Sequence, residues 1–145
     1  MESVNLMPIL YEDFPRKATR EESFATLDNQ QTLVVTLAAG KGTIAEAFAF
    51  DENGNTITQA YAGQGVGLQI NIKNTGGTDN IWCSVYDKDT GQLITRTDGI
   101  SLTWHGILNA GATQPWTATA WSNGQPTLVM PNKTWNLLIQ VGHGT

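Results

Sequence analysis

The chain has 145 residues, of which 40% are hydrophobic and only 14% are charged. This length suits one domain with its own core, and the hydrophobic share excludes general disorder. The net charge is −5, and the basic residues form no stripe beyond Arg16, Lys17 and Arg20, so we expect no nucleic-acid partner. The longest apolar runs, at residues 33–37 and 137–141, are too short to cross a bilayer, and we expect no membrane partner.

Residues 1–25 differ from the rest of the chain in charge. They carry eight charged side chains, whereas residues 99–145 carry one, Lys133. The N-terminus has no basic region followed by a sustained apolar run, so we expect no secretion signal and a protein made in the cytoplasm. The single cysteine, Cys83, allows no intrachain disulfide.

The same 25 residues contain Pro8, Pro15 and five large apolar side chains without strict alternation. These side chains are Leu6, Ile9, Leu10, Tyr11 and Phe14. Residues 19–24 have the pattern of one capped helical turn, which is too short to be stable alone. One interpretation is a frayed terminus. We favour an extended N-terminal arm that buries these side chains against a neighbouring molecule, because so many apolar groups make a poor solvated tail.

The remaining residues, 26–145, form one predicted domain made of β-strands. The clearest strand is at residues 68–73, where Leu68, Ile70 and Ile72 alternate with polar residues. The predicted strands are residues 33–37, 43–50, 56–61, 68–73, 81–87, 92–96, 101–104, 115–121, 127–130 and 135–141. Turn sequences rich in Asn, Asp and Gly separate them at short intervals, which predicts an all-β antiparallel sandwich or barrel.

None of the reactive residue types forms a convincing catalytic or metal-binding group. His105 and His143 each stand alone without neighbouring ligands, whereas zinc takes three or four. The acidic stretches 51–55 and 87–91 resemble calcium loops superficially, but Asp, Asn and Gly at hairpin turns explain both. Cys83 is in phase with apolar strand residues, which predicts a small buried side chain rather than a nucleophile.

We therefore predict that the protein is not an enzyme and holds no cofactor. Catalysis would require distant carboxylates such as Glu46 and Asp98 to converge, and no motif indicates that they do. The sequence contains neither a nucleophile elbow nor a phosphate-binding glycine loop.

The tryptophans are concentrated in the second half of the chain. They are Trp82, Trp104, Trp116, Trp121 and Trp135. One or two suit the core of a sandwich, which leaves others partly exposed. Exposed tryptophan is typical of protein interfaces and of sugar-binding faces. Because charge is scarce around them, we predict an interface, with Trp104, Trp116 and Trp121 as candidates.

Four features in residues 68–141 carry a resemblance to a known class of modules. They are the turn at residues 74–76, the hairpin at 85–91, the Leu-Asn-Ala-Gly at 108–111, and Met130-Pro131 before the last strand. In these features the chain resembles Ig-like sandwich modules of prokaryotic surface proteins and of tailed-virus virions. This implies an antiparallel Ig-like or jelly-roll-type β-sandwich that binds rather than catalyses.

The organisation of the whole chain also resembles the decoration, or cement, proteins that cap the heads of tailed phages. The resemblance implies a structural virion protein that is made in a host cytoplasm and acts on the capsid. Its partners would be other copies of itself, as in a trimer, and the major capsid protein. The alternative class is a carbohydrate- or cell-surface-binding module in which exposed tryptophans stack on sugar rings.

Overall fold

The computed structural model describes residues 25–144. The predicted arm anchors Leu6, Ile9, Leu10, Tyr11 and Phe14 lie outside the described residues, as does the predicted helical turn at 19–24. The chain divides into two units, Met1–Val35 and Thr36–Thr145. Every strand in the described range belongs to the second unit. Over residues 25–144 there is no helix that is long and apolar enough to span a membrane.

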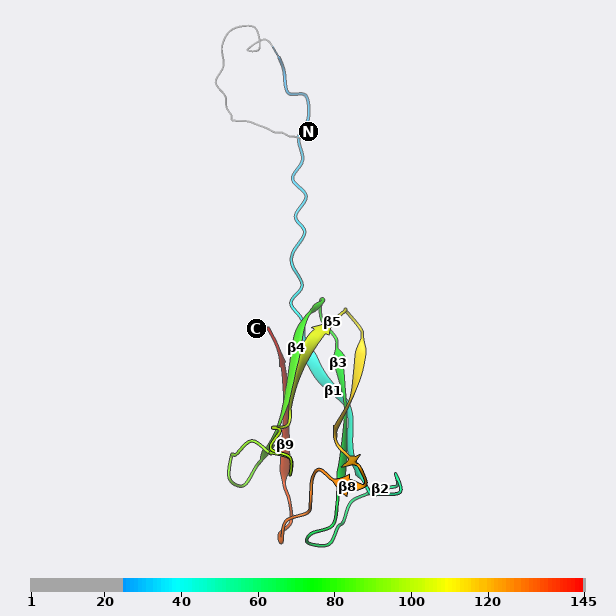
Figure 1. The fold of residues 1–145 in the computed structure, drawn as a ribbon. Helices are drawn as coiled ribbons and strands as arrows, with labels where there is room; N and C mark the ends of the chain where they lie inside the picture. Colours follow the sequence, from blue (N-terminus) through cyan, green and yellow to red (C-terminus); the bar gives the residue numbers. More distant parts are fainter. Residues whose placement is uncertain (1–24, 145) are drawn as a thin grey trace. The chain divides into compact units, whose positions relative to one another are not determined.

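The second unit is built from two antiparallel sheets and a short ribbon (Figure 1). The first sheet has the order β2-β1-β3-β6, and the second has the order β5-β4-β9. The strands are β1 (Gly42–Phe50), β2 (Thr56–Ile57), β3 (Gly67–Asn74), β4 (Asp79–Asp87), β5 (Thr103–Leu108), β6 (Thr113–Thr119), β7 (Trp121–Ser122), β8 (Gln125–Pro126) and β9 (Leu137–His143). This arrangement confirms the predicted all-β antiparallel class.

The two sheets share one core because their central strands alternate strictly. On β3, Ile70 and Ile72 are 1% and 0% exposed, while Gln69 and Asn71 point outward. On β4, residues 81, 83 and 85 are all fully buried. The period of two that is visible in the sequence therefore gives the buried faces of both sheets.

Several predicted strands are shorter than expected or do not form. Residues 92–96 and 127–130 make only isolated bridges, and the return strand at 56–61 is limited to Thr56–Ile57. Residues 33–37 were predicted as a strand, and this is wrong for the described chain, since they pair with no other segment. A β-rich run becomes a strand only when a partner satisfies its backbone hydrogen bonds.

A buried asparagine fixes the point where the chain enters the first sheet. Asn74 is fully buried, and its Oδ1 accepts hydrogen bonds from the amides of Lys41 and Gly76. Its Nδ2 donates to the carbonyls of Gly77 and Leu108. One side chain thus connects the segment just before β1 to the turn that follows β3 and to the end of β5.

Candidate interaction site

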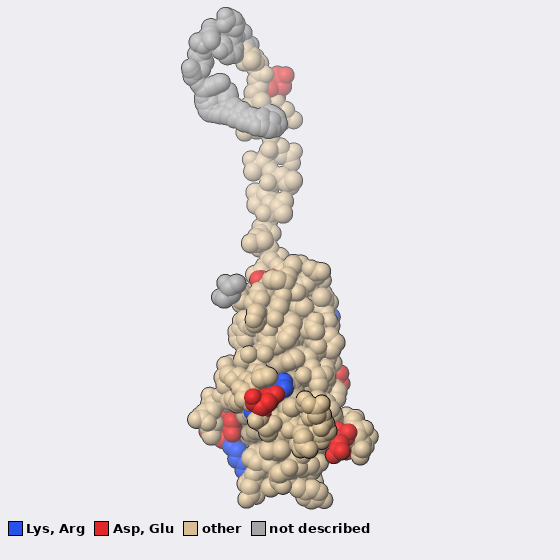
Figure 2. Space-filling model, in the orientation of Figure 1, with Lys and Arg blue, Asp and Glu red and all other residues tan. Residues whose placement is uncertain are grey.

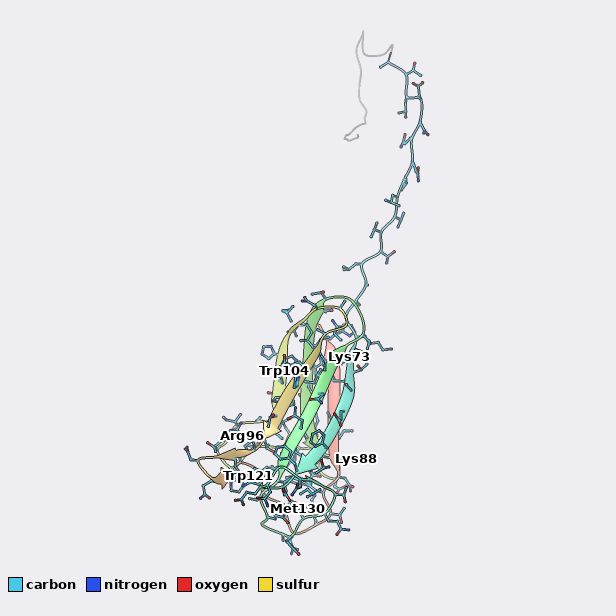
Figure 3. All side chains as sticks on the ribbon, turned by 90° about the vertical axis from the view of Figure 1, so that its right-hand side faces the viewer. Lys73, Lys88, Arg96, Trp104, Trp121 and Met130 are labelled. Atoms are coloured by element: carbon cyan, nitrogen blue, oxygen red, sulfur yellow. The ribbon has the colours of Figure 1, made fainter. Side chains whose placement is uncertain are left out.

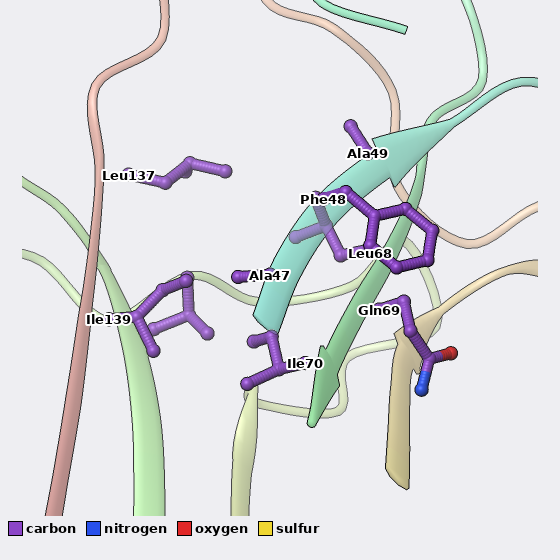
Figure 4. Close-up of a pocket in the computed structure, with 9 residues that line it drawn as sticks. Ala47, Phe48, Ala49, Leu68, Gln69, Ile70, Leu137 and Ile139 are labelled. Carbon is purple, nitrogen blue, oxygen red and sulfur yellow. The ribbon is translucent and has the colours of Figure 1, made fainter. Parts of the chain in front are cut away.

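A groove runs between β1 of the first sheet and β9 of the second. Its volume is about 170 Å³. It is lined by Ala47, Phe48, Ala49, Leu68, Gln69, Ile70, Val85, Leu137 and Ile139. Figure 4 shows Ala47 and Ile70 pointing toward Leu137 and Ile139 across the opening. Gln69 is the only polar lining residue and it points away, so the interior of the groove is apolar.

The groove exists because the two sheets are close at one end and separate toward the other. At the closed end, a side chain on Gly42 would meet the Val141 Cγ2 atom at 2.7 Å. Farther along β1 the inward positions are Ala47 and Ala49, which are too small to fill the distance to β9. Ala47 consequently remains exposed although it faces inward.

The outer edge of β9 is open along this groove. Lys88 donates its amide proton to the Asn136 carbonyl, and Gly144 donates to Asn80. In an antiparallel pair the hydrogen-bonding direction alternates, so the even-numbered residues of β9 bond to β4. Leu137, Ile139 and Val141 direct their N–H and C=O groups away from β4, and no described strand pairs with them there. The edge of β1 over residues 42–48 is likewise without a partner in the described chain.

A second surface with exposed aromatic and aliphatic side chains lies on the outer face of the β5-β4-β9 sheet, which also carries polar residues such as Ser84 and Gln140. Trp82 and Tyr86 are on the outward side of β4. The indole ring of Trp82 covers Gly142 of β9, where an added Cβ would lie 2.4 Å from the ring. Leu138 and Ile107 flank these aromatic rings at 37% and 70% exposure. All of these side chains are uncharged.

The outer face of the other sheet is polar instead. Thr117 donates to Gln69, Gln69 donates to Asn71, and Asn71 donates to Glu46. This chain of hydrogen bonds crosses β6, β3 and β1. Because its polar groups satisfy one another, this face offers less to an apolar partner than the outer face of the β5-β4-β9 sheet does.

The three tryptophans predicted for an interface have different surroundings in the structure. Trp104 and Trp116 are partly buried and pack against the core. Trp121 lies beside Phe50 with the ring centroids 6.1 Å apart. Figure 3 shows Trp104 and Trp121 at different levels of the sandwich. Trp82, which the sequence analysis did not name as an interface candidate, lies on the outer face of the β5-β4-β9 sheet.

Charge is distributed unevenly over the sandwich as well. In Figure 2 the coloured side chains gather toward the end that holds β2 and β8, and much of the remaining visible surface is uncharged. The main ionic group there is Lys133, whose Nζ lies 2.7 Å from Asp87 Oδ2 and 3.7 Å from Asp89 Oδ2. The hydrogen bond from Lys133 lowers the pKa of Asp87, and the same bond raises the pKa of Lys133. This group ties residues 131–136 to the end of β4, just before β9 begins.

Replacing Lys133 by methionine should lower the melting temperature by a few degrees at neutral pH. The pKa of Asp87 is depressed in the folded state, so its contribution is present above the unfolded pKa of about 4 and is lost as pH falls further. The pKa of Lys133 is raised, so its contribution persists below the unfolded value and is lost only at very alkaline pH. Thermal melts near pH 7 and near pH 2 should show a difference between variant and parent only at the higher pH.

Lys88→Met is the matched control. This substitution removes the same charge, but Lys88 makes no ion pair with a described residue. Equal losses for the two variants at neutral pH would contradict a specific role of the Lys133 pair.

Two other reactive side chains have clear surroundings in the structure. Cys83 is fully buried, and burial raises the pKa of its thiol to about 11, which leaves almost no thiolate near neutral pH. The Asp51 carboxylate accepts the amide protons of Asn53 and Asn55, so it stabilises a turn. Within residues 25–144 no group of three or more His, Cys, Asp or Glu side chains is placed to hold a metal ion.

Comparisons with known protein families, curated proteins and solved structures find no match to this chain.

Proposed function

We propose that this protein is a structural assembly protein that binds neighbouring subunits through apolar surface. The observation that carries the proposal is the groove between β1 and β9, which is apolar inside and bordered by unpaired strand edges. Open edges of this kind favour the addition of another chain. The uncharged outer face around Trp82 supports the same conclusion, because charged residues are depleted at the centres of interfaces.

The assembly that we propose is a virion, with this chain as a capsid decoration protein. The support is the resemblance of the sequence to Ig-like virion modules and to decoration proteins that combine a β domain with an N-terminal arm. The strand order β1-β3-β6 against β5-β4-β9 is compatible with an Ig-like sandwich, in which a further strand stands beside the position of β9. The partners would be other copies and the major capsid protein.

Deletion of residues 1–25 should leave the β domain folded and abolish incorporation into the assembly. The expected reason is loss of the apolar side chains that the arm would bury on a neighbour. Co-sedimentation with assembled particles measures incorporation, and circular dichroism measures the fold. Unchanged incorporation of the shortened chain would remove the arm from the proposal. A full chain that light scattering finds to be a strict monomer at high concentration would contradict self-assembly.

The outer face of the β5-β4-β9 sheet favours a second candidate function, the binding of carbohydrate. Trp82 and Tyr86 present aromatic surface there, and Ser84 and Gln140 lie opposite each other on the same face. Aromatic rings beside hydroxyl and amide groups suit the stacking and hydrogen bonding of sugars. A glycan array probed with the full chain and with Trp82→Ala would decide, since binding lost on substitution supports this candidate and absence of binding by either chain rejects it.

A further inference from the structure

The segment before β1 is an apolar run for which the described chain provides no partner. Residues 25–39 form neither helix nor strand, and every one of them is exposed. Leu33, Val35 and Leu37 are 82%, 84% and 94% exposed. They alternate with Thr32, Val34 and Thr36, and no charged residue occurs between residues 29 and 40. This pattern is that of a strand with one apolar face.

The groove between β1 and β9 is complementary to such a strand. Its open edge on β9 offers backbone groups at Leu137, Ile139 and Val141, at every second residue. A strand paired there would direct alternate side chains between the sheets, where Ala47 and Ala49 leave space. Five residues of strand span about 14 Å from first to last, which is less than the seven residues of β9.

We propose that residues 31–37 of one copy add as a strand to the free edge of β9 in a second copy. Leu33, Val35 and Leu37 enter the groove of the acceptor, and Thr32, Val34 and Thr36 face outward. The backbone pairing supplies affinity, and the apolar side chains determine the register. This inference rests on the proposed assembly function and names the partner, which is another molecule of this chain.

The connection to β1 favours a second copy over the same chain as the acceptor. Ala39 accepts a hydrogen bond from Gly77, and Gly40 and Lys41 donate to Asp79 and Asn74. Folding back into its own groove would require the chain to reverse between Leu37 and Ala39. That stretch holds neither glycine, proline, asparagine nor aspartate, which are the residues that favour tight reversals. A strand supplied by another copy needs no reversal.

Each copy would then donate one strand and accept one, so the contact is heterologous. Such a contact closes into a ring or continues as a filament. This property allows a test with two variants that block opposite sides of the same contact.

Val35→Asp blocks the donor strand, because a carboxylate would be buried in the apolar groove. Ala47→Trp blocks the acceptor by filling the groove. In the full-length chain each variant should weaken self-association by more than about 100-fold, so that light scattering gives the mass of one chain, 15.7 kDa. Mixed together they should form a 1:1 dimer and nothing larger, since Val35→Asp keeps a free groove and Ala47→Trp keeps an intact strand.

Val34→Asp is the matched control, since it places the same charge on the outward face and should preserve assembly. Far-ultraviolet circular dichroism and thermal melts of every variant establish that the β domain keeps its fold, because Ala47→Trp adds a near-ultraviolet signal of its own. A synthetic peptide of residues 30–38 gives a second readout, and it should bind the Val35→Asp chain but not a chain that also carries Ala47→Trp.

Three results would overturn the inference. The first is that the Val35→Asp chain and the Ala47→Trp chain each still self-associate. The second is that their mixture remains monomeric and the peptide does not bind. The third is that residues 33–37 of the wild-type monomer are protected from hydrogen exchange. In the first case the chain still assembles by another surface, so the proposed function stands. A different result is a wild-type chain that remains monomeric and enters no particle, although the peptide binds the groove. In that case the proposed function fails, but the specificity of the groove for this strand is supported.

Discussion

Substitution of Asn74 by alanine should lower the free energy of unfolding by about 3–5 kcal/mol. The side chain is fully buried and makes four hydrogen bonds, to the backbone of Lys41, Gly76, Gly77 and Leu108. Alanine would leave buried donors and acceptors without partners, and each of these costs about 1–3 kcal/mol. Urea denaturation followed by tryptophan fluorescence measures the loss.

Asn71→Ala is the matched control three residues earlier on the same strand. Asn71 lies on the outer face and bonds to the side chains of Gln69 and Glu46, where water can replace each partner. Its loss should change stability by less than about 1 kcal/mol. Similar losses for the two variants would show that the network around Asn74 is not the special feature of this strand.

The Asn74 network also links stability to assembly. Lys41 is held by Asn74 immediately before β1, and residues 31–37 precede it by only a few positions. Release of this anchor should increase hydrogen exchange at residues 40–42 and 76–77 before the remainder of the sheet opens. The donor strand would then be attached to a less ordered base, which increases the entropic cost of adding it to a neighbour.

The central strands could be predicted from the sequence because their alternation is regular. Residues 68–73 and 81–87 appear in the structure as β3 and β4 with little change at their ends. Residues 33–37 have an equally strong β composition and form no strand in the described chain. The alternation of residue types predicts which side chains would lie on each face of a strand. It does not show whether another strand is available to pair with it.

The candidate site could not be predicted from the sequence, because it forms only where β1 of one sheet lies beside β9 of the other. Ala47 and Ile139 are far apart in the chain, and only the packing of one sheet on the other brings them to the same groove. A small residue such as Ala47 gives no sequence signal when its role is to leave space. The tryptophans, in contrast, are conspicuous in the sequence by their number. The face of the sheet that each one occupies nevertheless follows from strand register, which the sequence does not give.

Trp116→Ala should cost about 3 kcal/mol of stability, whereas Trp82→Ala should cost about 1 kcal/mol or less. Trp116 is on the inward side of β6 and packs against the core, so its removal leaves a cavity that neighbouring strands cannot fill. Trp82 is on the outer face over Gly142, where water replaces the lost contacts. Denaturant titration monitored by far-ultraviolet circular dichroism compares the two variants without relying on tryptophan emission.

The same pair of variants separates a core role from an interface role. If Trp116 belongs to the core, its variant should lose stability in the monomer and regain assembly at low temperature, where the fold is populated. Trp82→Ala should keep the stability of the monomer, so any assembly or sugar binding that it loses is assigned to the outer face. A Trp116→Ala monomer with unchanged stability and impaired association would instead support the interface assigned from the sequence, because the ring would then be satisfied by a partner rather than by its own core.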